Sequence, residues 1–259
     1  MAEETNGVAI SLKGRRALVT GGAAGIGQAI AIALAAAGAD VAITTHARPG
    51  DETLSAVRRA GRQGHAVAAD LGAMRIADAE ALVADVEDAL GPLDILVNNA
   101  GIIRRADAVD HPSEDWRAVM ATNLDALWFL SQAAGRGMCR RGHGRIVNIA
   151  SLLSFQGGIR VPGYAAAKHG VAGLTKALAN EWAPLGVNVN AIAPGYIATE
   201  NTRALRQDPE RSRQILERIP AGRWGEPGDI AGVAVFLASP AAAYIHGAIL
   251  PVDGGWMGR

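Results

Sequence analysis

Residues 16–39, RALVTGGAAGIGQAIAIALAAAGA, decide the fold that we predict for this chain. The short apolar run from Arg16 to Thr20 predicts a buried strand, and the alanine-rich stretch from Ile26 to Ala37 predicts a helix that ends at Gly38. A glycine-rich turn between a strand and a helix lets the backbone approach a pyrophosphate, whose charge is favoured by free N–H groups at the helix N-terminus. The pattern predicts a dinucleotide site that uses Gly21, Gly25, Ile26 and Gly27.

The same stretch must be weighed against a membrane span, because residues 17–39 carry no charge over 23 positions. The glycines of the turn would interrupt a spanning helix, so a buried strand, turn and helix is the better interpretation. Residues 1–14 are acidic and lack an apolar centre, unlike a secretory signal. We therefore expect no membrane partner.

Strands and helices alternate along the remaining chain. Near-continuous apolar strands with intervening helices are typical of a parallel sheet covered on both faces. We predict a single-domain α/β fold of the Rossmann type over residues 1–259, a doubly wound parallel sheet of about seven strands with helices on both faces. Further strands are expected at 40–45, 65–69, 93–97, 145–149, 187–192 and 248–252, and the longest helices at 73–90, 113–138, 163–182 and 227–237.

Composition excludes several classes of function. Lys plus Arg and Asp plus Glu number 25 each, so no net field attracts nucleic acid or an anionic membrane. Cys139 is the only cysteine, which excludes an intrachain disulfide and favours a reducing, cytoplasmic location. The six histidines show no metal-ligand spacing, so no metal is expected.

Tyr164 and Lys168 lie one turn apart on one face of the expected helix 163–182. A phenol is a weak acid and base at neutral pH, but a neighbouring ammonium favours the phenolate and lowers its pKa. This couple suits proton exchange with an alcohol or ketone. Taken alone, such a pair is also typical of a solvated helix surface.

The motifs taken together resemble the short-chain dehydrogenase/reductase family over nearly the whole chain. The resemblance assigns catalysis to Ser151, Tyr164, Lys168 and Asn123, the last through its backbone carbonyl and a bound water. It favours Ser151 over Ser154, because Ser151 stands thirteen residues before the tyrosine. It implies dinucleotide contacts from Thr20, Gly21, Gly25, Ile26, Gly27, Thr45, Asp70, Leu71, Asn98, Ala100, Gly101, Tyr164, Lys168, Pro194, Gly195, Ile197 and Thr199. By themselves, Asp70 and the Asn98-Asn99 pair also fit loop caps and turns.

Two long stretches, residues 150–162 and 219–225, resemble the 2-dehydro-3-deoxy-D-gluconate 5-dehydrogenase branch of that family. The branch implies hydride transfer between a nicotinamide cofactor and a keto or hydroxy sugar acid in uronate and pectin breakdown. A reductase of 3-oxoacyl thioesters and another polyol or keto-acid dehydrogenase remain alternatives. Two alternatives without catalytic activity remain as well. One is a dinucleotide-binding sensor, and the other is a structural subunit that uses the fold only for assembly.

An acid substrate requires a cation, and arginine suits a carboxylate best because it offers two parallel hydrogen bonds. We expect one of three arginines to hold the carboxylate, in the order of preference Arg104, Arg160, Arg105. Ser151 and Gln156 are expected beside the substrate. Each arginine could instead pair with a nearby acid such as Asp107, Asp110 or Glu200. NAD is the expected cofactor on the branch resemblance, with NADP not excluded, because the position near Thr45 lacks the acidic residue of NAD-selective folds.

Assembly follows from helices that are apolar on several sides. The helix at 113–138 and the helix after Tyr164 carry apolar residues around much of their circumference. A sheet covers only one side of a helix, so we expect these helices to pack across a twofold axis. The resemblance implies a homotetramer, with the C-terminal strand and Trp256 at a second interface.

Overall fold

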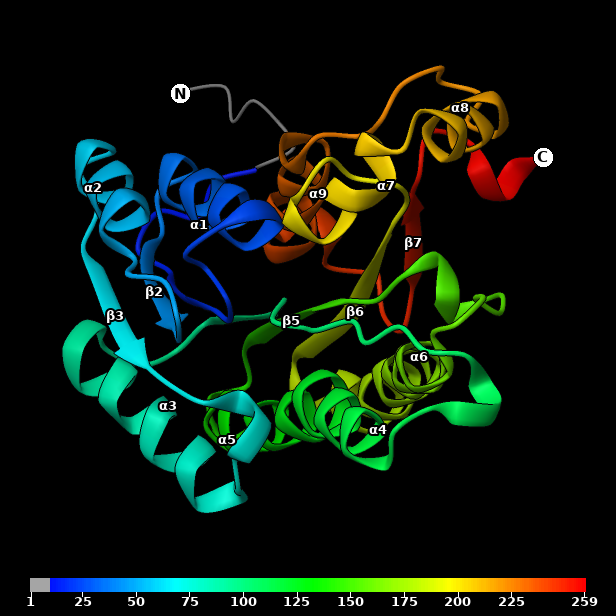
Figure 1. The fold of residues 1–259 in the computed structure, drawn as a ribbon. Helices are drawn as coiled ribbons and strands as arrows, with labels where there is room; N and C mark the ends of the chain where they lie inside the picture. Colours follow the sequence, from blue (N-terminus) through cyan, green and yellow to red (C-terminus); the bar gives the residue numbers. More distant parts are fainter. Residues whose placement is uncertain (1–9) are drawn as a thin grey trace.

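A computed structural model describes residues 10–259, so most of the acidic N-terminal stretch lies outside the described residues. Seven strands form one parallel sheet, as predicted (Figure 1). Their apolar runs are covered on both faces, which is why they read as continuous hydrophobic segments. The strands are β1 (Arg16–Val19), β2 (Asp40–Thr45), β3 (Gly64–Ala68), β4 (Ile95–Asn98), β5 (Gly144–Ile149), β6 (Val187–Pro194) and β7 (Ile249–Val252).

The strand order is β3-β2-β1-β4-β5-β6-β7. The chain adds strands toward one edge of the sheet from β1 to β3 and then toward the other edge from β4 to β7, so the order of winding reverses between β1 and β4. Val97 of β4 is in register with Val19 of β1 on one side and with Val147 of β5 on the other. The loops that follow these three strands therefore leave the sheet side by side. In open parallel sheets, ligands bind outside the carboxyl ends of the strands at such a reversal.

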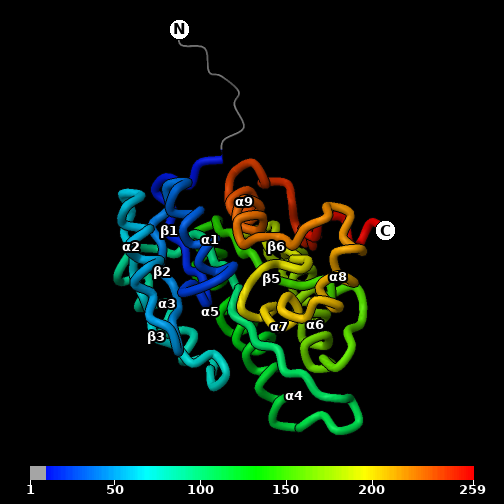
Figure 2. The backbone as a smooth tube through the Cα atoms, turned by 45° about the horizontal axis from the view of Figure 1, so that its top comes forward, coloured from blue at the N-terminus to red at the C-terminus, as the bar shows by residue number. Residues whose placement is uncertain are grey.

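Helices cover both faces of the sheet (Figure 1). One face carries α1 (Gly25–Ala36), α2 (Asp51–Arg59) and α9 (Pro227–Ala238), and the other carries α3 (Ile76–Leu90), α4 (Ser113–Met120), α5 (Ala126–Arg141) and α6 (Pro162–Trp182). Two shorter helices, α7 (Arg203–Gln207) and α8 (Pro209–Arg218), follow β6, and we call them together the lid. Figure 2 shows the lid standing in front of β5 and β6.

Two hydrophobic layers hold the sheet between its helices. Leu34 of α1 and Ile230 of α9 are fully buried on one face, and Leu130 and Met138 of α5 are buried on the other. Burying each such side chain contributes about 1.5–3 kcal/mol. No helix within residues 10–259 combines the length and the apolarity that a membrane crossing requires.

The helix predicted at 113–138 is interrupted. After α4, residues Ala121–Asp125 form a π turn, closed by a hydrogen bond from the Ala126 N–H to the Ala121 carbonyl. The buried Asn123 side chain accepts from the Ile102 N–H at 2.8 Å and donates to the Ile102 carbonyl at 2.9 Å. A single-turn π bulge of this kind is frequent near functional sites. It ties the helix to the loop that follows β4.

Candidate active site

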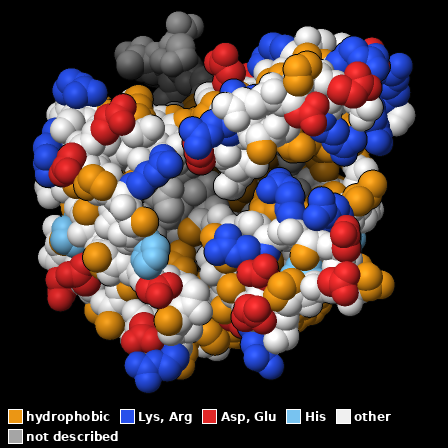
Figure 3. Space-filling view, in the orientation of Figure 1, with side chains coloured by type: hydrophobic (Ala, Val, Ile, Leu, Met, Phe, Trp, Pro, Cys, Tyr) orange, Lys and Arg blue, Asp and Glu red, His pale blue; other side chains and the backbone are white. Residues whose placement is uncertain are grey.

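A large cavity of about 1750 Å³ opens at the carboxyl edge of the sheet. Figure 3 shows it as a hollow between the upper and lower parts of the molecule, with Lys and Arg side chains on both sides. Its walls come mainly from the loops after β1, β2, β3, β4, β5 and β6, from α6 and from the lid. Segments that are far apart in the sequence thus meet at one site, as the parallel strand order requires.

The glycine turn after β1 forms one end of the cavity. Gly21 and Gly25 have φ values of 64° and 57°, a left-handed conformation that L side chains avoid. A Cβ on Gly27 would lie 2.3 Å from the Gly21 carbonyl oxygen, so no larger residue fits there. Thr44 adds a support that the sequence did not reveal, because its hydroxyl accepts from the Gly21 N–H at 2.9 Å. This cradle fits the pyrophosphate of a dinucleotide.

Two residues predicted to touch the cofactor lie beneath the cavity wall instead. Asn98 is buried and donates to Ser131 and Asn148, because alternation along β4 turns its side chain into the core. The Thr20 hydroxyl accepts from the backbone N–H groups of Asn99 and Ala100 at 2.9 Å each. Neither Asn98 nor Thr20 lines the cavity, so their contact with a cofactor remains a prediction. Both residues support the turn that contains Asn99, and Asn99 itself lines the cavity.

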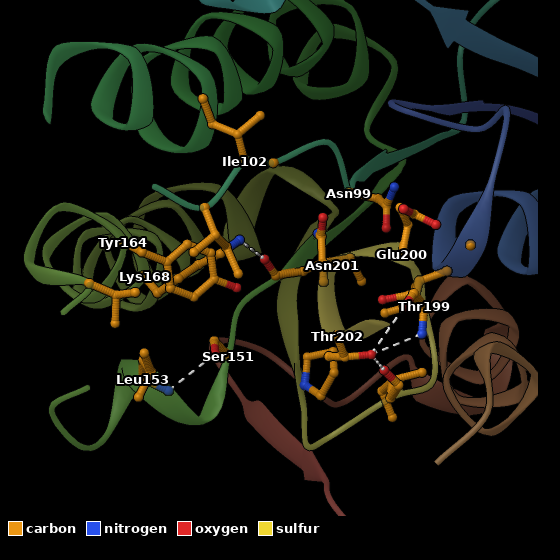
Figure 4. Close-up of a pocket in the computed structure, with 18 of the residues that line it drawn as sticks. Asn99, Ile102, Ser151, Leu153, Tyr164, Lys168, Thr199, Glu200, Asn201 and Thr202 are labelled. Atoms are coloured by element: carbon orange, nitrogen blue, oxygen red, sulfur yellow. Dashed lines mark hydrogen bonds between the residues drawn. The ribbon is translucent and has the colours of Figure 1, made fainter. Parts of the chain in front are cut away.

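The other predicted cofactor residues line the cavity. Asp70 caps its own loop by accepting from the Gly72 N–H at 2.9 Å, so its proposed contact with adenine remains a prediction. The corner that holds Thr199 is fixed by Thr202, whose hydroxyl donates to Ile197 and accepts from the Thr199 N–H (Figure 4). The lining includes Thr45, Asp70, Leu71, Ala100, Gly101, Pro194, Gly195, Ile197 and Thr199.

Ser151 and Ser154 have different surroundings. The Ser151 oxygen accepts from the Leu153 N–H at 3.1 Å (Figure 4), and the same hydroxyl is hydrogen-bonded to the Tyr164 phenol, whose pKa it lowers. Ser154 is buried, and its hydroxyl donates to the Lys168 carbonyl at 2.7 Å. Of these two serines, only Ser151 lines the cavity, and its role in orienting the substrate remains a prediction.

Tyr164 and Lys168 project from α6 toward the cavity, one turn apart (Figure 4). The Lys168 ammonium is buried, donates to the Ile149 carbonyl at 2.6 Å and lies 5.6 Å from the centre of the Tyr164 ring. Burial lowers the pKa of Lys168 to about 8. This burial is the observation that separates the pair from a solvated helix surface.

Burial also acts on the phenol. It raises the pKa of Tyr164 above its usual value, and the Ser151 hydroxyl and the Arg105 charge offset only part of that rise. The expectation that Lys168 lowers this pKa was wrong, because burial outweighs every other influence here. The Lys168 ammonium is also directed at a carbonyl rather than at the phenolic oxygen. Tyr164 is held as a neutral phenol, a proton donor.

The three predicted substrate arginines differ in their partners. Arg104 pairs with Asp115 at 3.3 Å, and Arg160 pairs with Asp107 at 3.0 Å. Arg105 forms no ion pair with any of residues 10–259, lines the cavity and acts on the pKa of Tyr164. Of the three, Arg105 is the one without an acidic partner among the described residues, which favours it over Arg104 and Arg160, and the arginine that contacts the carboxylate remains a prediction.

Arg160 joins two loops at the cavity mouth. Its carbonyl accepts from the Ala106 N–H at 3.1 Å while its side chain pairs with Asp107. Its φ of 64° is the only left-handed value at a non-glycine residue among those described. Gln156 lines the same mouth but donates to the Met257 sulfur. Arg160 thus holds together two loops that form the wall of the cavity.

The lid also lines the cavity, which the sequence did not predict. Arg206, Arg211, Gln214 and Arg218 face it, and Arg218 lies over the ring of Trp256 at 4.0 Å. Trp256 is buried against Tyr196, a setting in which it supports the lid. Residues 10–259 contain no cluster of three or more His, Cys, Asp or Glu that could hold a metal ion.

Comparisons with known proteins agree with this geometry. A family model described as enoyl-(acyl carrier protein) reductase matches residues 21–257. The 2-dehydro-3-deoxy-D-gluconate 5-dehydrogenase of Bacillus subtilis (strain 168) is 56% identical over 252 residues, which cover 97% of this chain and 98% of that protein.

Two solved structures extend the agreement to three dimensions. A protein from Agrobacterium tumefaciens, assigned as a 2-deoxy-D-gluconate 3-dehydrogenase with bound NADP, is 60% identical with a TM-score of 0.89, covering 97% of this chain and 99% of that one. A protein from Beutenbergia cavernae, assigned as an NAD(P)-dependent gluconate 5-dehydrogenase with bound NADP, is 51% identical with a TM-score of 0.92, covering 97% and 100%. The chain belongs to the short-chain dehydrogenase/reductase family.

Proposed function

We propose that this chain is an NAD(P)-dependent oxidoreductase that interconverts the hydroxyl and keto groups of a sugar acid. The observation that carries the proposal is Arg105, a cation without an acidic partner among the described residues, close enough to Tyr164 to act on its pKa. Burying a substrate carboxylate without a partner would cost several kcal/mol. An arginine at this place offsets that cost and favours acids over neutral carbonyl compounds.

The proposed mechanism assigns one task to each side chain. The Ser151 hydroxyl donates a hydrogen bond to the substrate oxygen and fixes its position. Tyr164 gives its phenolic proton to that oxygen during reduction and takes it back during oxidation. Lys168 supports proton exchange at Tyr164, and we assign the proton path that reaches Lys168 to the Asn123 backbone carbonyl and a bound water. The nicotinamide cofactor, when bound, supplies or accepts the hydride.

The substrate that we favour is 2-dehydro-3-deoxy-D-gluconate, oxidised at carbon 5. Support comes from the relative in Bacillus subtilis that carries this activity in its name and matches nearly the full length of both chains. A place in uronate and pectin breakdown follows from that substrate.

The residues beyond β2 bear on the choice between NAD and NADP. Thr45, His46 and Arg48 line the cavity beyond β2, where an NAD-selective site would carry an acidic residue. A cation at this place suits a 2′-phosphate, and both solved relatives described above hold NADP. We propose that both dinucleotides are used.

A substrate panel tests the proposal. Keto-deoxy sugar acids and acetoacetyl thioesters are each offered with NAD(H) and NADP(H), for the wild type and for Arg105→Met. We expect turnover of the sugar acid, and a KM for the acid that rises about tenfold or more in the variant. Preferential turnover of thioesters would establish the acyl reductase alternative. No turnover with any carbonyl compound would favour a sensor or a purely structural subunit.

Assembly as a cytoplasmic homotetramer is part of the proposal. Trp128 and Phe129 of α5 and Leu174 of α6 remain only half-buried in the single chain, as helices that meet a second copy would be. Light scattering at micromolar concentration should give a mass near four chains. A monomer would rule this assembly out.

A further inference from the structure

The lid helix α8 presents two faces with opposite charge balance. On its outer face, Arg213 pairs with Glu210 at 2.8 Å and with Glu217 at 2.5 Å. On the face toward the cavity, Arg211 and Arg218 stand seven residues apart, two helical turns, with Gln214 between them. Within residues 10–259, neither of these two arginines has an acidic partner within 4 Å. The arginine on the outer face of α8 is thus neutralised by two glutamates, whereas the two arginines on the cavity face have no acid beside them.

Arg218 is held in place before any ligand arrives. Its guanidinium lies 4.0 Å from the centre of the Trp256 ring, a stacked geometry that leaves the edge of the guanidinium available for hydrogen bonds. Trp256 is buried beside Tyr196, with 4.7 Å between ring centres. The neighbouring Ile215 fixes α8 to the same apolar cluster. An arginine that is already ordered loses less side-chain entropy when it binds an anion.

The cations of the lid lie on a different wall from Arg105. Arg105 belongs to the loop after β4, and Arg211 and Arg218 belong to the insertion after β6. Figure 3 shows basic side chains on both sides of the hollow. Basic residues outnumber the acids Asp70 and Glu200 in the cavity lining, and such an excess of positive charge concentrates anions. One carboxylate at Arg105 would leave the lid cations without a partner.

We propose that Arg218 and Arg211 form a second anion site, which takes the far end of a doubly anionic sugar acid. This inference rests on the proposed function, in which Arg105 receives the first carboxylate. The planar guanidinium fork fits a carboxylate and a phosphate alike, so the ligand class comprises sugar diacids and phosphorylated sugar acids. Such compounds join the monoacid as ligands of the same cavity.

Calorimetry on the cofactor-loaded enzyme at constant ionic strength tests the second site with three six-carbon probes: D-gluconate, D-glucarate and 6-phospho-D-gluconate. They share one carboxylate and differ at the other end of the chain. We expect D-glucarate, 6-phospho-D-gluconate or both to bind about tenfold tighter than D-gluconate, and which of them does so identifies the second group. The ratio should fall toward one in Arg218→Met and partly recover in Arg218→Lys, which restores charge without the fork.

Arg213→Met is the matched control, since it removes a cation from the outer face of the same helix and should retain the wild-type ratio. A ratio near one in the wild type, or equal ratios in Arg218→Met and Arg213→Met, would overturn the second anion site while the proposed function stands. If no acid binds the wild type, both proposals fail together. If the wild type binds D-gluconate and Arg105→Met lowers the affinity for all three probes by the same factor, the first site is established independently of the second.

Discussion

Gly27→Ala tests the tightest contact in the glycine turn. The added Cβ would lie 2.3 Å from the Gly21 carbonyl oxygen and 2.4 Å from the Asn99 side-chain nitrogen, far inside van der Waals contact. The turn must move, which costs about 1–3 kcal/mol for overpacking. The hydrogen bond of 2.8 Å from Asn99 to the Thr20 carbonyl would be strained as well, at a further cost of about 1 kcal/mol.

The combined loss of roughly 2–4 kcal/mol should lower Tm by about 5–15 °C in a chain of this size. Dinucleotide affinity should fall too, because the displaced backbone N–H groups no longer face the pyrophosphate. Differential scanning calorimetry and calorimetric titration with NADP measure the two effects. Gly232→Ala in α9 is the control, since its Cβ meets nothing within 4 Å. If both variants match the wild type in Tm and affinity, the steric argument is refuted.

Three further predictions concern single side chains. Tyr164→Phe should abolish turnover yet bind NADP with nearly wild-type affinity in calorimetry, because only the proton donor is lost; appreciable activity would reject its role. The pKa of Lys168 is about 8 in the folded chain, against its ordinary value of 10.5 in the unfolded chain. The unfolded chain therefore binds more protons between these two values, and stability rises with pH there. Between pH 7 and 9.5, urea unfolding should show the wild type gaining about 2 kcal/mol relative to Lys168→Met, and a flat difference would contradict the buried, uncompensated ammonium. Arg48→Met should raise KM for NADP and spare KM for NAD in steady-state kinetics; equal effects would place Arg48 away from the 2′-phosphate.

The fold was predictable because its signals are local. Each strand is a short apolar run and each following helix begins within a few residues, so the alternation alone indicates a parallel sheet. The π turn at Asn123 was not predictable, because its cause is a pair of hydrogen bonds to Ile102, a residue in a distant loop.

The site was predictable only where a motif determines geometry. Gly21, Gly25, Ser151 and Tyr164 line the cavity as expected, because strand ends fix the first three and the first turn of α6 fixes Tyr164. The sequence did not reveal that the Asn98 side chain points into the core, which follows from the alternation of successive residues along a strand. The availability of each arginine could not be predicted from the sequence, because it depends on which acidic side chains the tertiary structure places beside it.

The junction made by Arg160 has a thermodynamic consequence for ligand entry. Its carbonyl and side chain join the loop after β4 to the loop between Ser151 and Tyr164. Fixing a free loop costs about 1–2 kcal/mol per residue in backbone entropy, and in this chain folding has already met that cost. An incoming acid encounters a wall that is ordered in advance, so its binding free energy is not reduced by ordering those two loops.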